Sequence, residues 1–409
     1  MRANQATRRH FLGSSLTASA GLAIGSSMPG PWMQAMARDV ASSDRILVVI
    51  QLSGGNDGLN TVVPYDHDEY RKARPKLGIP KTDVLKIDDQ LGLHPSLSGV
   101  NRLLEAGRFS VVQGVGYAMP NRSHFESMDI WHSCQRKEGR SGDGWLGRWI
   151  AATADSRTSD SVGLHLVREQ QPLALAGRGV QVPSIASVEQ FRLKVADDGL
   201  LGNSLMQAPS PANTGSGDLL GFLQSSTEAA LEASQRLEKA LKSPDASGDF
   251  PATQLGEKLR VVSRLILAGL STRVYYVTLD GFDTHSQQAL AHAGLLRQWS
   301  DATEALVNRL EQAGQAERVL VMTFSEFGRR VAENASEGTD HGAAAPMFFA
   351  GPKLANPLVG KHPKLSDLED GDLKFNTDFR GVYATVIEKW FESRSRDILG
   401  ESYPTLSLL

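Results

Sequence analysis

Short apolar runs rich in β-branched residues recur along the chain and predict the strands of a buried sheet. Gly, Pro or polar residues bound the runs, as is usual for strands whose two faces are both covered. The runs cover residues 46–52, 109–115, 274–279, 319–324 and 347–351. Their length and composition favour strands over short helices.

A long helix is predicted in segment 287–314, between the third and fourth of these runs. Its apolar residues recur at near-helical spacing, and Gly314 is placed to end it. A strand, a helix and a second strand in this order form a crossover between parallel strands. The helical positions are Leu290, Leu295, Trp299, Ala302, Leu306 and Leu310. The pattern predicts an α/β fold with a mostly parallel central sheet and helices on both faces.

Two segments differ from this pattern. Segment 207–255 is rich in Ser, Ala, Pro and Gly and is interpreted as a helical insertion with flexible flanks. Residues 1–37 contain Arg8 and Arg9, then a weakly apolar run that closes on Ala35-Met36-Ala37. This arrangement is typical of a twin-arginine export signal cleaved after Ala37. We therefore expect one domain over residues 38–409, passage through the twin-arginine translocon, and a location in the periplasm or elsewhere in the cell envelope.

Composition narrows the function further. The 43 basic and 46 acidic side chains give a formal net charge of -3, which argues against a nucleic-acid partner. No stretch after the signal is long and apolar enough to predict a transmembrane span. Cys134 is the one cysteine, so an intramolecular disulfide and a thiolate metal site are both excluded. Any metal must be held by oxygen and imidazole.

Polar clusters follow four of the predicted strands: SGGNDGLN, NRSHF, DGFDTH and SEFGRR. Ligand sites of open parallel sheets lie at the carboxyl ends of the strands, so these clusters should converge. A later loop, GTDHG, precedes the last predicted strand and should join them. The expected members of one shared site are Asp57, Ser123, Asp280, Asp283, His285, Glu326, Asp340 and His341.

The clusters offer candidate metal ligands. Asp283 and His285 lie within DGFDTH, a combination of carboxylates and imidazole that suits Zn²⁺ or Mn²⁺, although Asp and Thr also cap helices. His341 lies in a Gly-flanked loop, and Glu326 would be a hard oxygen ligand. Asp57 follows two glycines and could bind a cation or simply form a turn.

A hydroxyl and two guanidinium groups complete the candidates. Ser123 precedes a helix-like run, and Glu126 three residues later completes a capping box, so Ser123 is readable as a helix cap. It is equally readable as a nucleophile whose pKa a metal would lower. Arg329 or Arg330 could clamp an anion, or both could be solvated charges.

The motifs, in this order behind an export signal, resemble an exported bacterial family known as domain of unknown function number 1501. The resemblance covers nearly the whole mature chain, through VVIQLSGGNDGLNTVVPY, PNRSHFESMDIW, SGDGWLGRWI, VTLDGFDTHSQQ, TFSEFGRR and TDHGAAAPMFFAGP. That family is similar to the alkaline phosphatase and sulfatase superfamily. The similarity implies a three-layer α/β sandwich whose strand ends hold one or two metals beside a Ser, Thr or modified Cys nucleophile.

Roles carry over from the superfamily position by position. The resemblance implies that Ser123 is the nucleophile and that Asp57, Asp283, His285 and His341 bind metal. Glu326 stands where an Asp is usual. Phe327 stands where the adjacent His is usual. An apolar ring cannot coordinate a metal, so a second metal site would lose one ligand, which Asp280 or Asp340 could replace.

The leading hypothesis is an exported metal-dependent hydrolase of phosphate or sulfate esters, in which a divalent Zn, Mn or Ca ion assists attack by Ser123 and Arg329 steadies the anion. The alternative is a non-catalytic envelope protein that keeps the fold and serves in binding or assembly. A carbohydrate-active hydrolase that uses two of the carboxylates is a third interpretation. The sulfatase signature built on a modified Cys is absent, which disfavours that chemistry.

Overall fold

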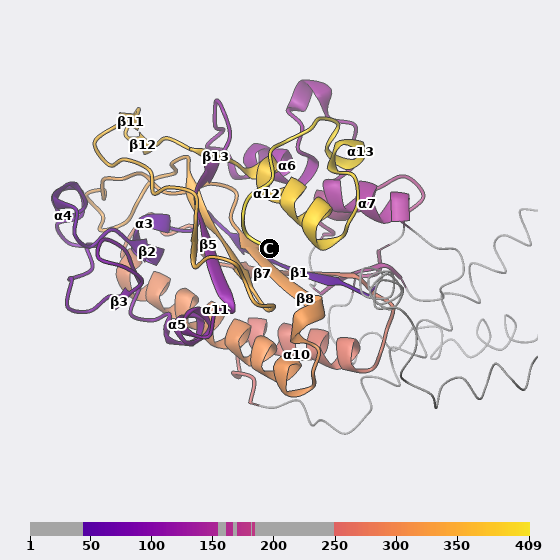
Figure 1. Ribbon diagram of the computed structural model, residues 1–409. Helices are drawn as coiled ribbons and strands as arrows, with labels where there is room; N and C mark the ends of the chain where they lie inside the picture. The colour runs from indigo at the N-terminus through magenta and orange to yellow at the C-terminus, as the bar shows by residue number, and fades with distance from the viewer. Residues whose placement is uncertain (1–43, 154–160, 167–169, 181, 185–248) are drawn as a thin grey trace, which may run out of the picture. The chain divides into compact units, whose positions relative to one another are not determined.

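The fold is built on a central sheet (Figure 1). The computed structural model of the chain describes residues 44–153, 161–166, 170–180, 182–184 and 249–409. Within these residues the sheet has eight strands, and seven of them follow the order β10-β5-β9-β8-β1-β7-β6, with β13 paired to β5. The strands are β1 (Ile46–Ser53), β5 (Phe109–Gly116), β6 (Gly163–His165), β7 (Val274–Asp280), β8 (Val319–Phe324), β9 (Ala345–Ala350), β10 (Leu358–Val359) and β13 (Thr377–Asp378).

Most neighbouring strands run parallel. Strand β1 lies between β7 and β8 and is parallel to both, which confirms the predicted crossover. Strand β9 is the exception, because it pairs antiparallel with both β5 and β8. All five predicted strands are present, and four of them direct their carboxyl ends to one edge. The reversed direction of β9 brings its amino end, and the GTDHG loop before it, to that same edge.

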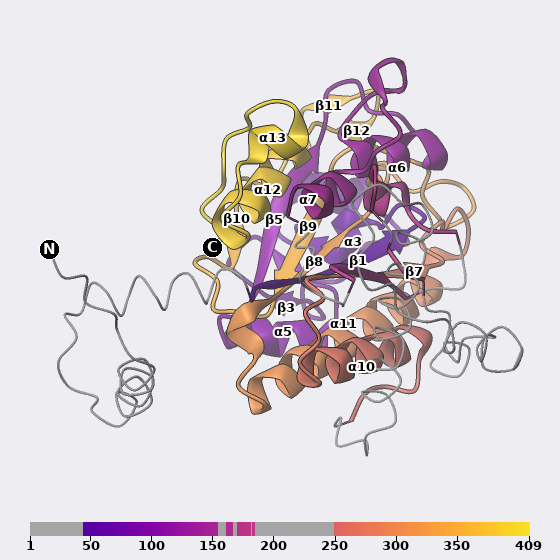
Figure 2. The same ribbon diagram turned by 90° about the vertical axis from the view of Figure 1, so that its right-hand side faces the viewer.

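Helices cover both faces of the sheet (Figure 2). One face packs against α5 (Ser98–Glu105), α10 (Gln254–Leu267) and α11 (Gln288–Gln312). The other packs against α6 (His124–Ser133), α7 (Trp145–Thr153), α12 (Phe379–Thr385) and α13 (Ser395–Leu399). Side chains of β1 alternate between the two cores, since successive residues of a strand point to opposite faces. The predicted α/β fold with helices on both faces is confirmed.

The described residues also contain shorter elements. The helical ones are α3 (Gly58–Thr61), α4 (Asp68–Ala73), η2 (Lys137–Gly139), η3 (Leu173–Leu175), η5 (Ala316–Arg318) and the π-helix η6 (Val386–Trp390). A small antiparallel sheet contains β2 (Val62–Val63), β4 (Gly92–Leu93) and β3 (Leu85–Lys86), and a hairpin contains β11 (Leu368–Glu369) and β12 (Asp372–Leu373).

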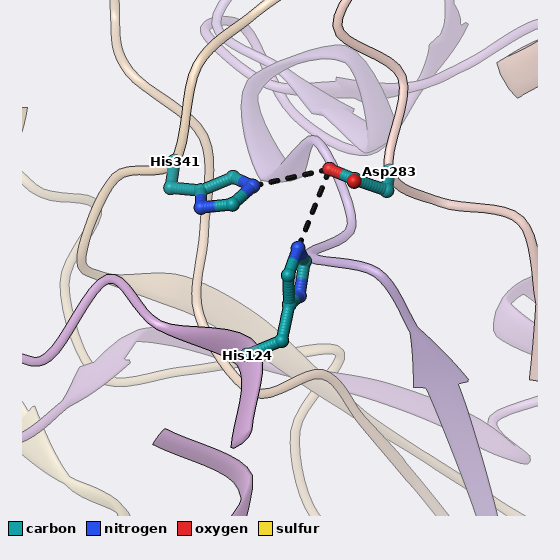
Figure 3. A group of neighbouring side chains, drawn as sticks. All are labelled: His124, Asp283 and His341. Carbon is teal, nitrogen blue, oxygen red and sulfur yellow. Dashed lines mark hydrogen bonds and ion pairs between the residues drawn. The ribbon is translucent and has the colours of Figure 1, made fainter. Parts of the chain in front are cut away.

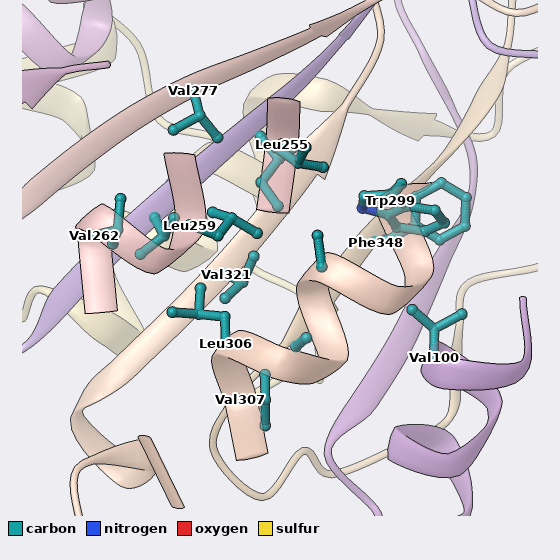
Figure 4. Packing of buried hydrophobic residues seen from close by; sticks show 14 of the residues in the cluster. Val100, Leu255, Leu259, Val262, Val277, Trp299, Leu306, Val307, Val321 and Phe348 are labelled. Atoms are coloured by element: carbon teal, nitrogen blue, oxygen red, sulfur yellow. The ribbon is translucent and has the colours of Figure 1, made fainter. Parts of the chain in front are cut away.

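Helix α11 confirms the predicted crossover helix and most of its predicted buried face, but its amino-terminal end differs. Leu290 is 88% exposed, whereas Trp299 and Leu306 are fully buried (Figure 4). The amino-terminal end buries Gln288 and His292 instead. Nε2 of His292 contacts the side-chain oxygen of Asn56 at 3.0 Å, a polar contact that apolar spacing does not reveal. The first turn of α11 therefore faces the polar edge of the sheet rather than the core.

Two predictions fall outside the described residues. They are the export signal over residues 1–37 and most of the insertion over residues 207–255. The described residues from Arg45 onward form one compact unit. None of the helices that the structure describes has both the length and the apolar character that a membrane span requires.

The packing of Trp299 generates a stability prediction. Its ring lies 4.8 Å from that of Phe348, and its indole N–H donates to Thr323 Oγ1 at 3.2 Å. We expect Trp299→Ala to lower the free energy of unfolding by about 3–5 kcal/mol, because it leaves a large cavity between α11 and the sheet. Urea unfolding followed by circular dichroism measures this change.

The matched control for this prediction is Leu290→Ala on the same helix. Its exposed side chain should contribute less than about 0.5 kcal/mol. Equal losses in the two variants would contradict the packing described for α11.

Candidate metal centre

Four side chains with metal-binding atoms meet at the carboxyl edge of the sheet. Asp283 and His285 lie in the loop after β7, His341 lies in the loop before β9, and His124 is the first residue of α6. Gly54, in the loop after β1, lets that loop pass beneath Asp283. A Cβ at Gly54 would lie 2.3 Å from the backbone nitrogen of Asp283, and the φ of Gly54 is +116°.

The four side chains converge on the carboxylate of Asp283. Its Oδ1 lies 3.1 Å from Nε2 of His341, 3.1 Å from Nε2 of His285 and 3.5 Å from Nε2 of His124. Nε2 of His285 is also 2.9 Å from Nε2 of His341. Figure 3 shows His124 and His341 pointing at Asp283 from two different segments. Ligand atoms around a tetrahedral zinc ion are about 3.3 Å apart, which is close to the separation of each Nε2 from Oδ1 of Asp283. His285 lies outside the group in which every ligand atom is within 4.8 Å of every other, which is His124, Asp283 and His341.

Hydrogen bonds on the far side of two imidazoles fix their orientation. Nδ1 of His124 lies 2.8 Å from Oε1 of Glu326, and Nδ1 of His341 lies 2.8 Å from the carbonyl oxygen of Arg122. A carboxylate and a carbonyl only accept hydrogen bonds, so each Nδ1 carries a proton and Nε2 is the ring nitrogen that can bind a metal. Histidine ligands of metals are commonly held in this way.

His285 is oriented by the same kind of contact. Its Nδ1 lies 3.2 Å from Oδ1 of Asp340, and the side-chain amide of Asn334 donates to that same oxygen at 3.2 Å. The hydrogen bonds from Asn334 and then His285 hold the pKa of Asp340 below its ordinary value despite partial burial. Asp340 therefore stays ionised and keeps the proton of His285 on Nδ1.

The donor set fits a divalent cation. Imidazole nitrogens and a carboxylate oxygen that face one another attract a positive charge placed among them. Nε2 of His124 is buried and has no hydrogen-bond partner within the described residues. Among those residues, His124, Asp283 and His341 form the group whose ligand atoms all lie within 4.8 Å of one another. Three nitrogens and one oxygen suit zinc better than calcium, which prefers oxygen throughout.

Arg329 holds Asp283 in place. Burial alone would raise the pKa of Asp283, but hydrogen bonds from Arg329 and His341 outweigh it and lower the pKa to about 2. The guanidinium of Arg329 is fully buried and donates to the backbone oxygens of Gly55 at 2.7 Å and Thr339 at 2.7 Å. It therefore differs from the expected anion clamp, which would need donors that face solvent.

Glu326 and Phe327 lie around the cluster rather than in it. Glu326 is 1% exposed, and its Oε1 accepts the backbone N–H of Gly54 at 2.9 Å besides contacting His124. Its carboxylate thus orients a ligand instead of facing the metal position. The ring of Phe327 packs 4.9 Å from that of His124 and 4.7 Å from that of His341. Apolar surface occupies the place where the resemblance puts another histidine.

Asp57 lies apart from the candidate ligands. Its carboxylate receives two hydrogen bonds from the buried guanidinium of Arg74, at 2.6 and 3.1 Å, and another from the side-chain amide of Gln288. Burial raises the pKa of Asp57, but the charge and hydrogen bonds of Arg74 outweigh that effect and bring the pKa to about 2. The structure therefore pairs Asp57 with a protein cation, and we leave it out of the ligand set.

Ser123 is exposed beside the cluster and does not cap α6 through its side chain. The side chain of Asn121 accepts the backbone N–H of Ser123 at 2.8 Å, and Glu126 bonds Arg140 at 2.7 Å. The partners that a capping box requires are thus engaged elsewhere. Both neighbours of Ser123 belong to the site, since His124 faces Asp283 and the carbonyl of Arg122 holds His341.

The sequence interpretation assigned no role to His124. The neighbouring Ser123 in NRSHF was assigned a role, and His124 was not. The sequence signal for His124 is its position at the start of a predicted helix, soon after a predicted strand ends.

Asp280 is the expected site residue left without a role. It ends β7, is exposed and lies opposite Ser53 in the register.

The family model that matches this sequence is the one described as protein of unknown function DUF1501, over residues 44–377. The chain belongs to this family. The match covers the strands, the loops of the metal cluster and the segment around Ser123, so the resemblance inferred from the motifs is confirmed. No curated protein matches the sequence significantly.

Solved structures of proteins from several bacteria match this chain. The lipoteichoic acid synthase LtaP from Listeria monocytogenes aligns with a TM-score of 0.40 and 9% identity, covering 90% of this chain and 77% of the other. A protein in the alkaline phosphatase superfamily from Vibrio parahaemolyticus aligns with a TM-score of 0.37 and 8% identity, covering 88% of this chain and 71% of the other. The C-terminal periplasmic domain of EcEptC from Escherichia coli, in complex with Zn, aligns with a TM-score of 0.36 and 9% identity. This alignment covers 76% of this chain and 74% of the other. These superpositions are too loose to transfer the role of any residue.

The geometry predicts one tightly bound metal ion. We expect the purified protein to contain about one equivalent of zinc, and Asp283→Ala to retain less than about a tenth of it, because the shared carboxylate would be gone. Metal analysis by mass spectrometry after dialysis measures both. The matched control is His67→Ala, which removes an imidazole outside the cluster and should keep the zinc. Two equivalents in the parent, or full retention in Asp283→Ala, would contradict the site.

The Asp57–Arg74 pair generates a second prediction. Arg74→Met should lower the free energy of unfolding at pH 7 by about 3–5 kcal/mol, since it leaves a buried carboxylate unpaired. The folded pKa of Asp57 is depressed, so the pair's contribution is present above the ordinary carboxyl pKa and is lost as pH falls from about 4 towards 2. Urea unfolding at pH 7 and pH 3 should therefore show a smaller difference at the lower pH.

The control for this pair is Arg394→Met, which removes an exposed arginine 3.7 Å from Asp397 and should cost less than about 1 kcal/mol. If Arg74→Met lowered the free energy of unfolding as little as this control does, the Asp57 carboxylate would not depend on Arg74.

Proposed function

We propose that this protein is an exported metal-dependent hydrolase of phosphate or sulfate esters. The observation that carries the proposal is the convergence of three oriented imidazoles and one carboxylate beside an exposed serine. The ligand side chains are partly open, with 47% of Asp283 and 46% of His285 exposed. A group in solution can therefore reach the cluster.

The residues that would hold the ion are His124, Asp283, His285 and His341, with zinc as the best fit. When bound, a divalent ion supplies Lewis-acid chemistry, lowering the pKa of a nearby hydroxyl and stabilising the charge of an ester oxygen. The protein keeps the three Nε2 lone pairs available through Glu326, Asp340 and the carbonyl of Arg122. Arg329 keeps Asp283 ionised and in place. This set replaces the ligands expected at Asp57 and Glu326.

Ser123 is the proposed nucleophile. Its Oγ would lose its proton to water and form a bond to the phosphorus or sulfur atom, while the bond to the ester oxygen breaks and that oxygen takes a proton from water. In the second displacement, water would bond to the phosphorus or sulfur atom while the bond to Oγ breaks. Phosphate or sulfate would leave, and Oγ would take up the proton that the attacking water gives up. The absence of a side-chain cap supports this role, because the hydroxyl is not committed to the helix.

Export is the remaining part of the proposal. The adjacent Arg8 and Arg9 and the small residues at 35–37 support a twin-arginine signal, passage through its translocon, and a location in the periplasm or cell envelope. The test compares the parent with a variant that carries Lys in place of both Arg8 and Arg9. Protein of mature size should be found in the periplasmic fraction of the parent and be lost from that of the variant.

A second candidate function is a non-catalytic envelope protein that binds a partner and keeps one structural metal. The pairing of Asp57 with Arg74 favours it, because a carboxylate that the resemblance assigns to a metal is neutralised by the protein. Four protein ligands around one ion are also typical of structural zinc sites. Turnover of an ester separates the two candidates.

The decisive variant is Ser123→Ala. With a panel of phosphate and sulfate monoesters, we expect the parent to turn over at least one substrate and Ser123→Ala to lose about 10³-fold or more in kcat, since the attacking group is removed. Zinc content should stay at the parent value, because Ser123 is outside the ligand set.

The control for this variant is Ser141→Ala, which removes another exposed hydroxyl. Unchanged kcat in Ser123→Ala would remove Ser123 from the mechanism. Zinc-loaded parent that turns over none of the esters would favour the binding protein.

A further inference from the structure

Two arginines share one buried carboxylate at the rim of the metal cluster. Nε of Arg122 donates to Oδ2 of Asp372 at 2.9 Å, and its Nη2 donates to the same oxygen. Nε of Arg330 lies 3.7 Å from the other oxygen, Oδ1, which is too far for a hydrogen bond. Asp372 belongs to β12 and its side chain is only 2% exposed.

Both arginines are tied by their backbones to the candidate ligands. The carbonyl of Arg122 accepts from Nδ1 of His341 at 2.8 Å. The backbone N–H of Arg330 donates to the carbonyl of Asp340 at 3.0 Å, and the side chain of Asp340 orients His285. Each guanidinium is therefore anchored next to a residue that faces the metal position or supports one that does.

The hydrogen bonds of this group are not balanced. Two guanidinium groups, each 39% exposed, flank the buried carboxylate of Asp372, and the charge of Arg330 also acts on Asp340. Within the described residues, the guanidinium of Arg330 makes no hydrogen bond, and Oδ1 of Asp372 is buried without a partner. Guanidinium groups are always charged and offer five donors, so the donors of Arg330 remain available.

We propose that Arg122 and Arg330 form an oxyanion subsite that takes the phosphate or sulfate group of the substrate. This inference rests on the proposed function and deepens it by assigning the anion to these two side chains. A guanidinium matches two oxygens of a tetrahedral oxyanion, and two of them can hold such a group from two sides. Asp372 fixes Arg122 from behind. The buried Arg329, which sequence reasoning favoured for this role, has its donors turned inward.

The test is the binding of inorganic phosphate, with inorganic sulfate as a second probe, to the zinc-loaded protein by isothermal titration calorimetry. The variant combines Arg122→Gln and Arg330→Gln with Asp372→Asn, because removing the arginines alone would leave a buried unpaired carboxylate. We expect it to bind phosphate at least about tenfold more weakly than the parent. Arg394→Gln, an exposed arginine elsewhere, should bind as the parent does.

A conservative variant guards against misfolding. Arg122→Lys with Arg330→Lys keeps both charges and loses the paired donors, so its phosphate affinity should fall between those of the parent and the triple variant. Thermal unfolding shows whether each variant is folded. Parent-like affinity in folded variants of both kinds would overturn the subsite.

The experiment separates this inference from the proposed function. If the arginine-dependent binding of phosphate is seen but no ester is turned over, the subsite stands and the hydrolase fails. If esters are turned over and the triple variant keeps the parent's kcat/KM and phosphate affinity, the hydrolase stands and the subsite is overturned.

Discussion

The buried guanidinium of Arg329 is the interaction on which the candidate site depends. A charge with no exposed surface is costly to bury unless its donors are satisfied. Here they are taken by backbone oxygens after β1, after β7 and before β9, and by Oδ1 of Asp283 at 2.7 Å. One side chain therefore ties together three loops that are distant in sequence. The three Nε2 atoms of the site lie 3.1 to 3.5 Å from Oδ1 of Asp283, the atom that this guanidinium holds.

Most of the sheet could be predicted because its strands are buried on both faces. Such strands are continuous apolar runs, and each of the five runs became a strand of the sheet. The antiparallel direction of β9 could not be read from the runs, since a reversed strand has the same composition as its neighbours. Leu290 shows a second limit. An apolar residue at the correct helical spacing is exposed there because polar contacts, not apolar packing, set the orientation of the first turn of α11.

The site was only partly predictable for a related reason. Asp283, His285 and His341 could be expected together, because strand direction brings the loops of a sheet edge to one place. The role of Asp57 depends on Arg74, and that of Arg329 on which carbonyls surround it. Neither relation has a sequence signature, since the partners come from loops whose paths are set by tertiary packing. His124 was hidden by the serine beside it, which matched a helix cap that the structure does not form.

These pairings bear on how many ions the site can hold. Asp57 is paired with Arg74, and Glu326 accepts hydrogen bonds from Gly54 and His124. The ring of Phe327 packs against His341. The described residues thus leave one set of free ligand atoms. A single ion neutralises only part of the negative charge of a phosphate or sulfate group, so positively charged side chains must neutralise the rest. Arg329 cannot do this, because Asp283 and the carbonyls use its donors. The exposed guanidinium groups beside Asp372 are placed to do so.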